Sequence, residues 1–161
     1  MPKKRRINCT LTLGKGCIVQ DDVIIGHSEK NDVIIGNNAL ISSGTIIYSK
    51  VKIGNNFRTG HRAFIRENSE IGDNVLIGTN TGFDGNYKVG SNVNIQTGAY
   101  ITAFTIAEDS VFIGHWLVTA NDQYMVAGAK IVGPTIKNGA GMRANSTILP
   151  DVVMGEGASV Q

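Results

Sequence analysis

A strict six-residue repeat runs from Ile35 to Val118 and constrains the fold of this chain more than any other feature. Of its fourteen hexads, thirteen open with an apolar residue, ten of which are Ile, and only Thr59 breaks the rule. The fourth position is Asn or Gly in nine hexads. The fifth position is small or apolar, as at Ala39, Val51, Ala63, Val75, Val93, Ala99 and Val111. A fixed short period of this kind is typical of a solenoid.

The spacing within a hexad indicates strands rather than helices. The apolar positions lie four and then two residues apart, and these even steps keep them on one face of an extended chain. A helical period of 3.6 would scatter them. Asn and Gly tolerate left-handed backbone dihedrals, so their recurrence predicts a corner at each fourth position. Three strands and three corners make a triangular coil of eighteen residues, and successive coils stack about 4.8 Å apart. The prediction is an all-β, single-stranded parallel β-helix.

The same register extends over most of the chain. Openers begin at Ile7, and about four extra residues around Glu29–Asp32 form a small loop. The repeat breaks after Val118 and resumes at Ile136, which predicts a protruding loop over residues 119–132. Twenty-four openers in total, taking Thr119 as the last before the break, predict about eight coils. We expect residues 1–161 to form a single domain, with residues 1–6 as a basic N-terminal tail.

Composition and charge narrow the class of protein. The chain has 161 residues, of which 42% are hydrophobic and 6% aromatic, and its net charge of +2 owes much to Lys3, Lys4, Arg5 and Arg6. The remaining 11 basic and 13 acidic residues make the body slightly negative, so we expect no nucleic-acid surface there. The tail itself is either a nuclear-targeting or nucleic-acid arm or a solvated terminus.

Cysteine usage and hydropathy point to a reducing compartment. Cys9 and Cys17 do not form a CxxC pair, and the inward position of Cys17 favours a buried thiol over a disulfide. Neither a signal peptide nor a membrane span is apparent. We therefore expect a cytoplasmic protein.

The sequence resembles the hexapeptide-repeat acyltransferases, and within them the branch that acetylates nucleotide-linked amino sugars. The resemblance is carried by "FRTGHRAFIRENSEIGDNVLIGTNTGFDG", "VNIQTGAYI", "SVFIGHWLVTANDQY" and "GPTIKNGAGMRANSTILPDVVMGEGASV". It implies a left-handed coil, a homotrimer with active sites in the grooves between subunits, acetyl-CoA along the C-terminal coils and no metal. It favours N-acetylation over O-acetylation. Two features depart from the family: a terminal "VTKD" stretch is absent, and His115 replaces a common Pro.

The repeat places the candidate catalytic residues by arithmetic. Residues eighteen apart stack on one column of the prism, so Ser43, His61, Thr79, Thr97 and His115 share a face. Acetyl transfer to an amine or hydroxyl needs a group that accepts the nucleophile's proton, and histidine suits this role near neutral pH. His61 matches the family's "GH" hexad, which makes it the candidate general base, with His115 as the alternative. The two lie three coils apart, about 14 Å, and cannot act together at one reacting atom.

The other candidate residues surround this column. Glu67, at the next corner of the coil, either orients an imidazole or is a solvated carboxylate. The candidate substrate-binding residues lie in the quoted stretches and at the point where the loop leaves the prism. The loop itself is either a substrate lid or a mobile hairpin. These candidates are Asn80, Asn121, Asp122 and Tyr124. The resemblance assigns coenzyme binding to the C-terminal coils, where the candidates are Trp116, Lys137, Gly141, Arg143, Ala144 and Ser146.

Three functions compete. The first is a coenzyme A-dependent acetyltransferase acting on a nucleotide-linked sugar. The second is a γ-class carbonic anhydrase, which would need three ligating histidines, two of them about five residues apart. The chain has only His27, His61 and His115, and Arg66 stands where a partner of His61 would fall. The third is a non-catalytic trimeric β-helix scaffold.

Overall fold

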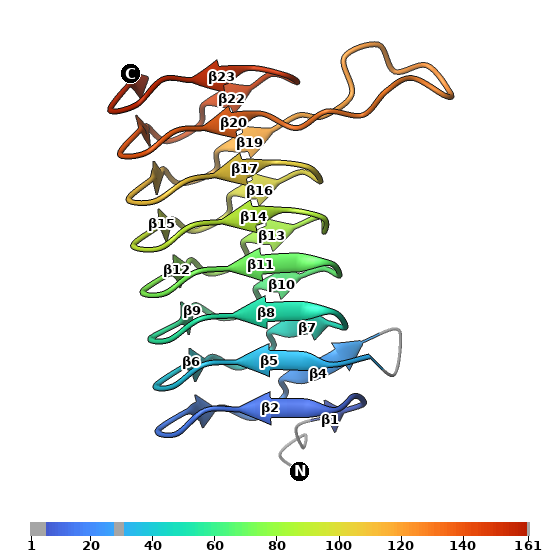
Figure 1. The fold of residues 1–161 in the computed structure, drawn as a ribbon, viewed down its shortest axis with the longest axis vertical. Coiled ribbons are helices and arrows are strands. Elements are labelled where there is room, and N and C mark those ends of the chain that lie inside the picture. Colours follow the sequence, from blue (N-terminus) through green and yellow to red (C-terminus); the bar gives the residue numbers. More distant parts are fainter. Residues whose placement is uncertain (1–5, 28–30, 161) are drawn as a thin grey trace.

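A computed structural model describes residues 6–27 and 31–160, and every regular element in these ranges is a short β-strand. There are 24 strands in three parallel eight-stranded sheets, and each sheet takes every third strand along the chain. The triangular β-helix of about eight coils is therefore confirmed (Figure 1). The front strands of Figure 1 run from right to left as the chain climbs, which gives the coil its left hand. The chain is a left-handed parallel β-helix.

We name the three sides of the triangle after their sheets. Sheet A contains β1 (Arg6–Ile7), β4 (Ile24–His27), β7 (Ile46–Tyr48), β10 (Phe64–Ile65), β13 (Gly82–Phe83), β16 (Tyr100–Ile101), β19 (Val118–Thr119) and β22 (Thr147–Ile148). Sheet B contains β2 (Leu11–Leu13), β5 (Val33–Ile35), β8 (Val51–Ile53), β11 (Ser69–Ile71), β14 (Lys88–Val89), β17 (Ile106–Ala107), β20 (Thr135–Ile136) and β23 (Val153–Met154). Sheet C contains β3 (Ile18–Val19), β6 (Leu40–Ile41), β9 (Arg58–Thr59), β12 (Leu76–Ile77), β15 (Asn94–Ile95), β18 (Phe112–Ile113), β21 (Gly141–Met142) and β24 (Ser159–Val160).

The strand register reproduces the eighteen-residue coil and its two interruptions. Ile65 pairs with Phe83 and, on its other side, with Ile47, each eighteen residues away. Ile25 pairs with Ile47 at a step of 22, which accommodates the four extra residues of the first loop. Ala107 pairs with Ile136 at a step of 29, eleven more than eighteen, which is the second loop. Insertions at a corner therefore leave the sheets in register.

Two boundaries differ from those predicted. Thr119 lies in β19 and is 1% exposed, so the protruding loop begins after it and continues to Pro134, directly before β20. The strand includes Thr119 because it is the inward opener of its hexad. Of the predicted basic tail, residues 1–5 lie outside the described residues, and Arg6 belongs to β1. Residues 29 and 30 of the first loop also lie outside the described residues.

The corners form at the fourth position of the hexad, including positions where the sequence does not favour them. Asn and Gly take positive φ there, as predicted. The same left-handed conformation is imposed on Lys50, Arg62, Phe104 and Trp116, whose φ values are 57°, 54°, 65° and 57°. Strand pairing on both sides fixes the path of the chain, so tertiary structure overrides the local preference of these side chains.

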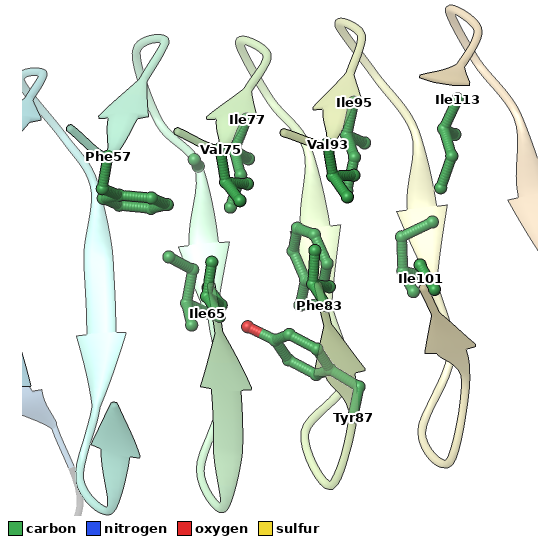
Figure 2. Close-up of a cluster of buried hydrophobic side chains, with 14 of the residues drawn as sticks. Phe57, Ile65, Val75, Ile77, Phe83, Tyr87, Val93, Ile95, Ile101 and Ile113 are labelled. Carbon is green, nitrogen blue, oxygen red and sulfur yellow. The ribbon is translucent and has the colours of Figure 1, made fainter. Parts of the chain in front are cut away.

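The core is a narrow column of inward side chains from the first and fifth positions. Figure 2 shows its middle part, where Ile65, Ile77, Ile95 and Ile101 come from different strands and all lie inside the prism. The Tyr87 ring lies 4.4 Å from that of Phe83 (centroid to centroid) and is fully buried. These side chains pack only against the coils directly before and after their own, as expected for a solenoid.

Thr59, the polar exception among the openers, is buried and hydrogen-bonded. Its Oγ1 accepts from the backbone N–H of Ser42 at 2.9 Å and lies 3.2 Å from the Thr45 hydroxyl oxygen. The same arrangement recurs on another side, where Thr119 Oγ1 accepts from the N–H of Thr102 at 2.8 Å. A buried hydroxyl at an opener position is thus tolerated because a backbone group of the preceding coil bonds to it.

Candidate functional site

The corner between sheets C and A carries the histidine column. The backbone N–H of His61 donates to Thr79 Oγ1 at 3.2 Å, and the His61 carbonyl accepts from Asn80 N–H at 2.9 Å. Three coils further on, the His115 carbonyl accepts from Asn145 N–H in the same way. Both imidazoles lie on the exposed outer surface of this corner, which we call the C–A corner. The column places them as predicted, on one edge of the prism and three coils apart.

Asn80 and Trp116 lie beside the histidines on the fourth-position column. Arg62 Nε donates to Asn80 Oδ1 at 2.9 Å, which fixes the orientation of the amide. The Trp116 indole covers the Cα of Gly98, where an added Cβ would lie 2.6 Å from Cδ2 of the ring. Gly98 therefore leaves room for the indole, which is 58% exposed. Both residues present polar or aromatic groups to solvent at the C–A corner.

Glu67 lies at a different corner, between sheets A and B, which we call the A–B corner. Its two carboxylate oxygens accept from Arg66 Nη2 at 2.8 Å and Nε at 3.2 Å. Partial burial disfavours its charged form, but a backbone hydrogen bond and the Arg66 guanidinium outweigh this, and the pKa of Glu67 lies below its ordinary value. One side of the triangle separates this carboxylate from His61 of the same chain.

A network around Arg66 was not predicted from the sequence. Arg66 Nη1 also donates to Asp84 Oδ1 at 3.0 Å, and its guanidinium carbon lies 5.7 Å from the ring centroid of Tyr48. Burial and the Asp84 carboxylate raise the pKa of Tyr100, which stands next to this network. Tyr48, Arg66 and Asp84 are eighteen residues apart, so the same column arithmetic applied to second positions would have identified them.

The loop that contains Asn121, Asp122 and Tyr124 leaves the prism at the A–B corner and extends from it (Figure 1). Asn121 Nδ2 donates to the carbonyl of Ala103 at 3.2 Å, and Val132 N–H donates to the Asn121 carbonyl at 2.9 Å. Asp122 Oδ1 accepts from the N–H groups of Tyr124 and Met125. Asn121 and Asp122 therefore define the base and the first turn of the loop, whereas the Tyr124 side chain is exposed.

The residues assigned to the coenzyme are distributed over more than one edge of the prism. Lys137, after β20 of sheet B, donates to Glu108 Oε1 at 2.7 Å, and this bond lowers the pKa of Glu108. Gly141 lies in β21 of sheet C, and Ser146 Oγ donates to the Arg143 carbonyl at 2.9 Å. Arg143, Ala144 and Ser146 surround the C–A corner one coil beyond His115, whereas Lys137 lies next to the corner between sheets B and C, which we call the B–C corner.

A groove of about 610 Å³ runs along sheet B, opposite the C–A corner. Lys52, Glu70 and Lys88 line one part of it, and Gly54 and Gly72 leave it open. His61 is on the far side of the prism from this groove, so His61 and the groove cannot form one site within a single chain.

Within residues 6–27 and 31–160, no three His, Cys, Asp or Glu side chains are grouped so that they could hold a metal ion. In the same part of the chain, no helix is long and apolar enough to cross a membrane.

No family model matches the chain, and no curated protein matches it. Among solved structures, it is similar to a UDP-N-acetylglucosamine acyltransferase from Francisella novicida, with 17% identity over 89% of this chain and 60% of that one, at a TM-score of 0.43. A UDP-N-acetylglucosamine O-acyltransferase from Moraxella catarrhalis matches with 18% identity over 88% and 66% of the two chains, at 0.42. WeeI from Acinetobacter baumannii matches with 16% identity over 94% and 50%, at 0.27.

The chain thus spans 60% and 66% of the length of the first two of these proteins. Because these similarities are low, the fold is assigned from the strand pairing of the chain itself. The argument for a function rests on the residues of the C–A corner.

Proposed function

We propose that this protein transfers an acetyl group from acetyl-CoA to the amine of a nucleotide-linked sugar, with His61 as the general base. The observation that supports this most directly is the C–A corner, where an exposed imidazole stands beside an amide of fixed orientation. The B–C corner carries Asn, Asp and Ser, whose side chains bond to neighbouring coils. At the C–A corner, His61 departs from that pattern with an exposed imidazole, whose ring nitrogen can accept a proton.

The chemistry of acetyl transfer sets what the site must provide. The amine nitrogen attacks the thioester carbonyl carbon, a C–N bond forms, and the C–S bond breaks to release coenzyme A. His61 accepts the proton that the nitrogen loses, and the leaving sulfur takes up a proton as the thiol. Because Arg62 occupies Oδ1 of Asn80, the Nδ2 group of Asn80 is the part of that amide that would donate to a substrate oxygen. His61 as proton acceptor and Asn80 as hydrogen-bond donor both lie at the C–A corner.

A second copy of the chain completes the proposed site. In one chain, Lys137 and the loop with Asn121, Asp122 and Tyr124 lie at other corners than His61. A homotrimer with parallel axes brings a corner of one subunit against a side of the next, so acetyl-CoA would bind in the groove between them. In this arrangement Trp116, Gly141, Arg143, Ala144 and Ser146 contact the coenzyme, and the loop covers the nucleotide sugar.

Coenzyme binding tests this proposal first. Acetyl-CoA that binds only the folded protein adds RT ln(1 + [acetyl-CoA]/Kd) to the free energy of unfolding and so raises the melting temperature. We expect a rise at millimolar acetyl-CoA, a trimer in sedimentation, and thiol release in the presence of nucleotide-linked amino sugars. The same sugars with a hydroxyl in place of the amine distinguish N- from O-acetylation. If neither acetyl-CoA nor coenzyme A shifts the melting temperature, the non-catalytic scaffold is the better description.

A further inference from the structure

Sheet A presents an outward cluster that no part of the proposed chemistry uses. It combines the aromatic rings of Phe64 and Tyr100 with the ion-paired groups of Arg66, Glu67 and Asp84, and we call it the sheet A cluster. Its charged side chains are about one-third exposed, so they are accessible from solvent. Solvated ion pairs of this kind contribute only about 0–1 kcal/mol to stability, which is a weak structural reason for so many connected groups.

Its aromatic part is a platform of two rings. Phe64, Gly82 and Tyr100 are successive partners across β10, β13 and β16. A side chain at Gly82 would overlap the Phe64 ring, so this glycine allows the ring to lie along the sheet toward Tyr100. The two ring centroids are 6.1 Å apart, with planes inclined at 57°. Flat, partly exposed rings of this kind suit the apolar face of a ring-shaped ligand.

Its polar part presents hydrogen-bonding groups but no free positive charge. Three of the five Arg66 N–H groups donate to Glu67 and Asp84, which leaves two for a ligand. The carboxylate oxygens have further lone pairs available. One guanidinium and two carboxylates sum to a formal charge of −1, and Lys50, which helps to lower the pKa of Glu67, brings the sum to zero. The cluster therefore has no net positive charge to attract a phosphate. Neutral hydroxyl groups, which both donate and accept, are the ligand groups that this combination fits.

The position of the cluster connects it with the proposed site. Phe64 follows His61 by three residues, so their Cα atoms are at most about 10 Å apart. At the other edge of sheet A, the base of the loop contains Asn121, which stands on the column of Glu67 three coils away. Sheet A therefore runs from the candidate base to the root of the candidate lid.

We infer that the sheet A cluster binds the pyranose ring of the substrate, with one face of the sugar on Phe64 and Tyr100 and its hydroxyls on Arg66, Glu67 and Asp84. Naming the substrate's sugar as the ligand rests on the proposed function. The cluster accounts for the sugar and not for the nucleotide, because it has no net positive charge to hold a diphosphate.

Binding measurements on the full chain test this inference. The probes are UDP- and dTDP-linked hexoses, the corresponding free nucleoside diphosphates and acetyl-CoA. In saturation-transfer NMR, we expect saturation to reach the pyranose ring protons. Tyr100→Ala and the isosteric Asp84→Asn each raise the Kd for the nucleotide sugar at least about tenfold, since a lost ring contact or charged hydrogen bond has this magnitude. The Kd values for nucleoside diphosphate and acetyl-CoA stay within about twofold.

A control on another face of the same coil excludes a general effect of removing charge. Glu70 belongs to sheet B and forms an exposed pair with Lys88 at 4.0 Å, so Glu70→Gln leaves sugar binding unchanged. Tyr100→Phe keeps the platform and retains most of the affinity. Equal losses for sugar nucleotide and free nucleotide, unchanged binding by Tyr100→Ala, or no saturation of any pyranose proton would each overturn the inference.

The proposed function and this inference fail in different ways. A wild-type protein that binds the sugar through this cluster without acetylating it contradicts the proposed function alone. Acetyl transfer with an unchanged KM for the nucleotide sugar in Tyr100→Ala contradicts the inference alone.

Discussion

The B–C corner and the C–A corner have the same backbone path but different side chains. At the B–C corner, the second to fourth residues of three successive coils are Gly-Asn-Asn, Gly-Asp-Asn and Gly-Ser-Asn, starting at Gly54, Gly72 and Gly90. Their side chains bond from coil to coil: Asn56 Nδ2 donates to Asn74 Oδ1 at 2.8 Å, and Asn74 Nδ2 donates to Asn92 Oδ1 at 3.0 Å. At the C–A corner the corresponding hexads read Gly-His-Arg, Gly-Thr-Asn, Gln-Thr-Gly and Gly-His-Trp.

The difference separates structural from functional demands. Since the backbone turn is the same, Asn and Asp at the B–C corner suffice to build it. Residues that depart from this pattern at the C–A corner are not needed for the turn, and some of them oppose it: Arg62 and Trp116 occupy a left-handed conformation that their side chains disfavour. Changes at the B–C corner should therefore affect stability, and changes at the C–A corner should affect activity.

The largest effect is expected for His61→Ala. Loss of a general base lowers kcat about 10²–10⁴-fold. The side chain is exposed and no part of the turn depends on it, so the melting temperature stays within about 1 °C, as for other exposed substitutions. Steady-state kinetics and thermal unfolding of the same sample measure kcat and the melting temperature. His115→Ala is the matched control on the same column. A larger loss of kcat in His115→Ala than in His61→Ala would reverse the assignment of the base.

Gly54→Ala should have the opposite profile. A Cβ at Gly54 would lie 2.8 Å from the backbone carbonyl of Gly72 and closer still to Asp73 Oδ1, so the coils must separate. We expect destabilisation of about 2–3 kcal/mol, measured by urea unfolding, with kcat unchanged. Gly155→Ala is the matched control, because Gly155 stands on the same column but has nothing within 4 Å of an added Cβ. Equal losses in the two variants would show that coil spacing is not the cause.

The A–B corner tests an intermediate case, because Glu67 there is paired with Arg66. The pKa of Glu67 in the folded protein is below its ordinary value, so the pair contributes stability above about pH 4.3, the usual pKa of an unfolded Glu. This contribution is lost as pH falls through the lower folded value. Glu67→Gln should therefore lower the melting temperature by about 2 °C at pH 7, with the difference from wild type vanishing near pH 3. A difference that persists at pH 3 would point to packing instead of charge.

The smallest effect is a gain in stability at the same corner. Phe104 stands on the column of Asn68 and Asn86, with a φ of 65°, and its ring is half-exposed. Phe104→Asn relieves the unfavourable left-handed backbone and should stabilise the fold by about 0.5–1 kcal/mol. Phe104→Ala keeps a Cβ at this φ but lacks the polar side chain that favours a left-handed backbone, so we expect no gain in stability. Chemical unfolding of both variants measures the difference.

Most of the fold could be predicted because one hexad contains nearly all the information that a coil needs. Each of the 24 strands contains one opener, which is the last residue of every strand except β4 and β7, and the corners formed at the fourth position. Pattern alone could not give the hand of the coil, because apolar spacing is the same in either hand. The predicted loop, residues 119–132, differs from the observed one by one residue at its start, after Thr119, and by two at its end, Pro134, since the repeat does not mark where a loop leaves or rejoins the strands.

The candidate site was less predictable because outward residues obey no repeat. Column arithmetic over third positions placed His61 and His115 on one edge and gave Glu67. The other members of the sheet A cluster, which stand at second and sixth positions, were not predicted. Which side chains actually bond is a matter of rotamers: Arg66 turns toward Glu67 and Asp84, and Arg62 turns toward Asn80. No sequence period encodes those choices.

The register steps of 22 and 29 residues have a consequence for how such a chain can change. Extra residues leave at a corner and do not disturb the sheets, so corner loops can vary freely in length. Height along the prism behaves differently, because it changes only when a whole coil of eighteen residues is gained or lost, in steps of about 4.8 Å. The distance from His61 to the loop root is therefore quantised, and removing one coil between them would shorten a substrate site by one fixed increment while keeping every column aligned.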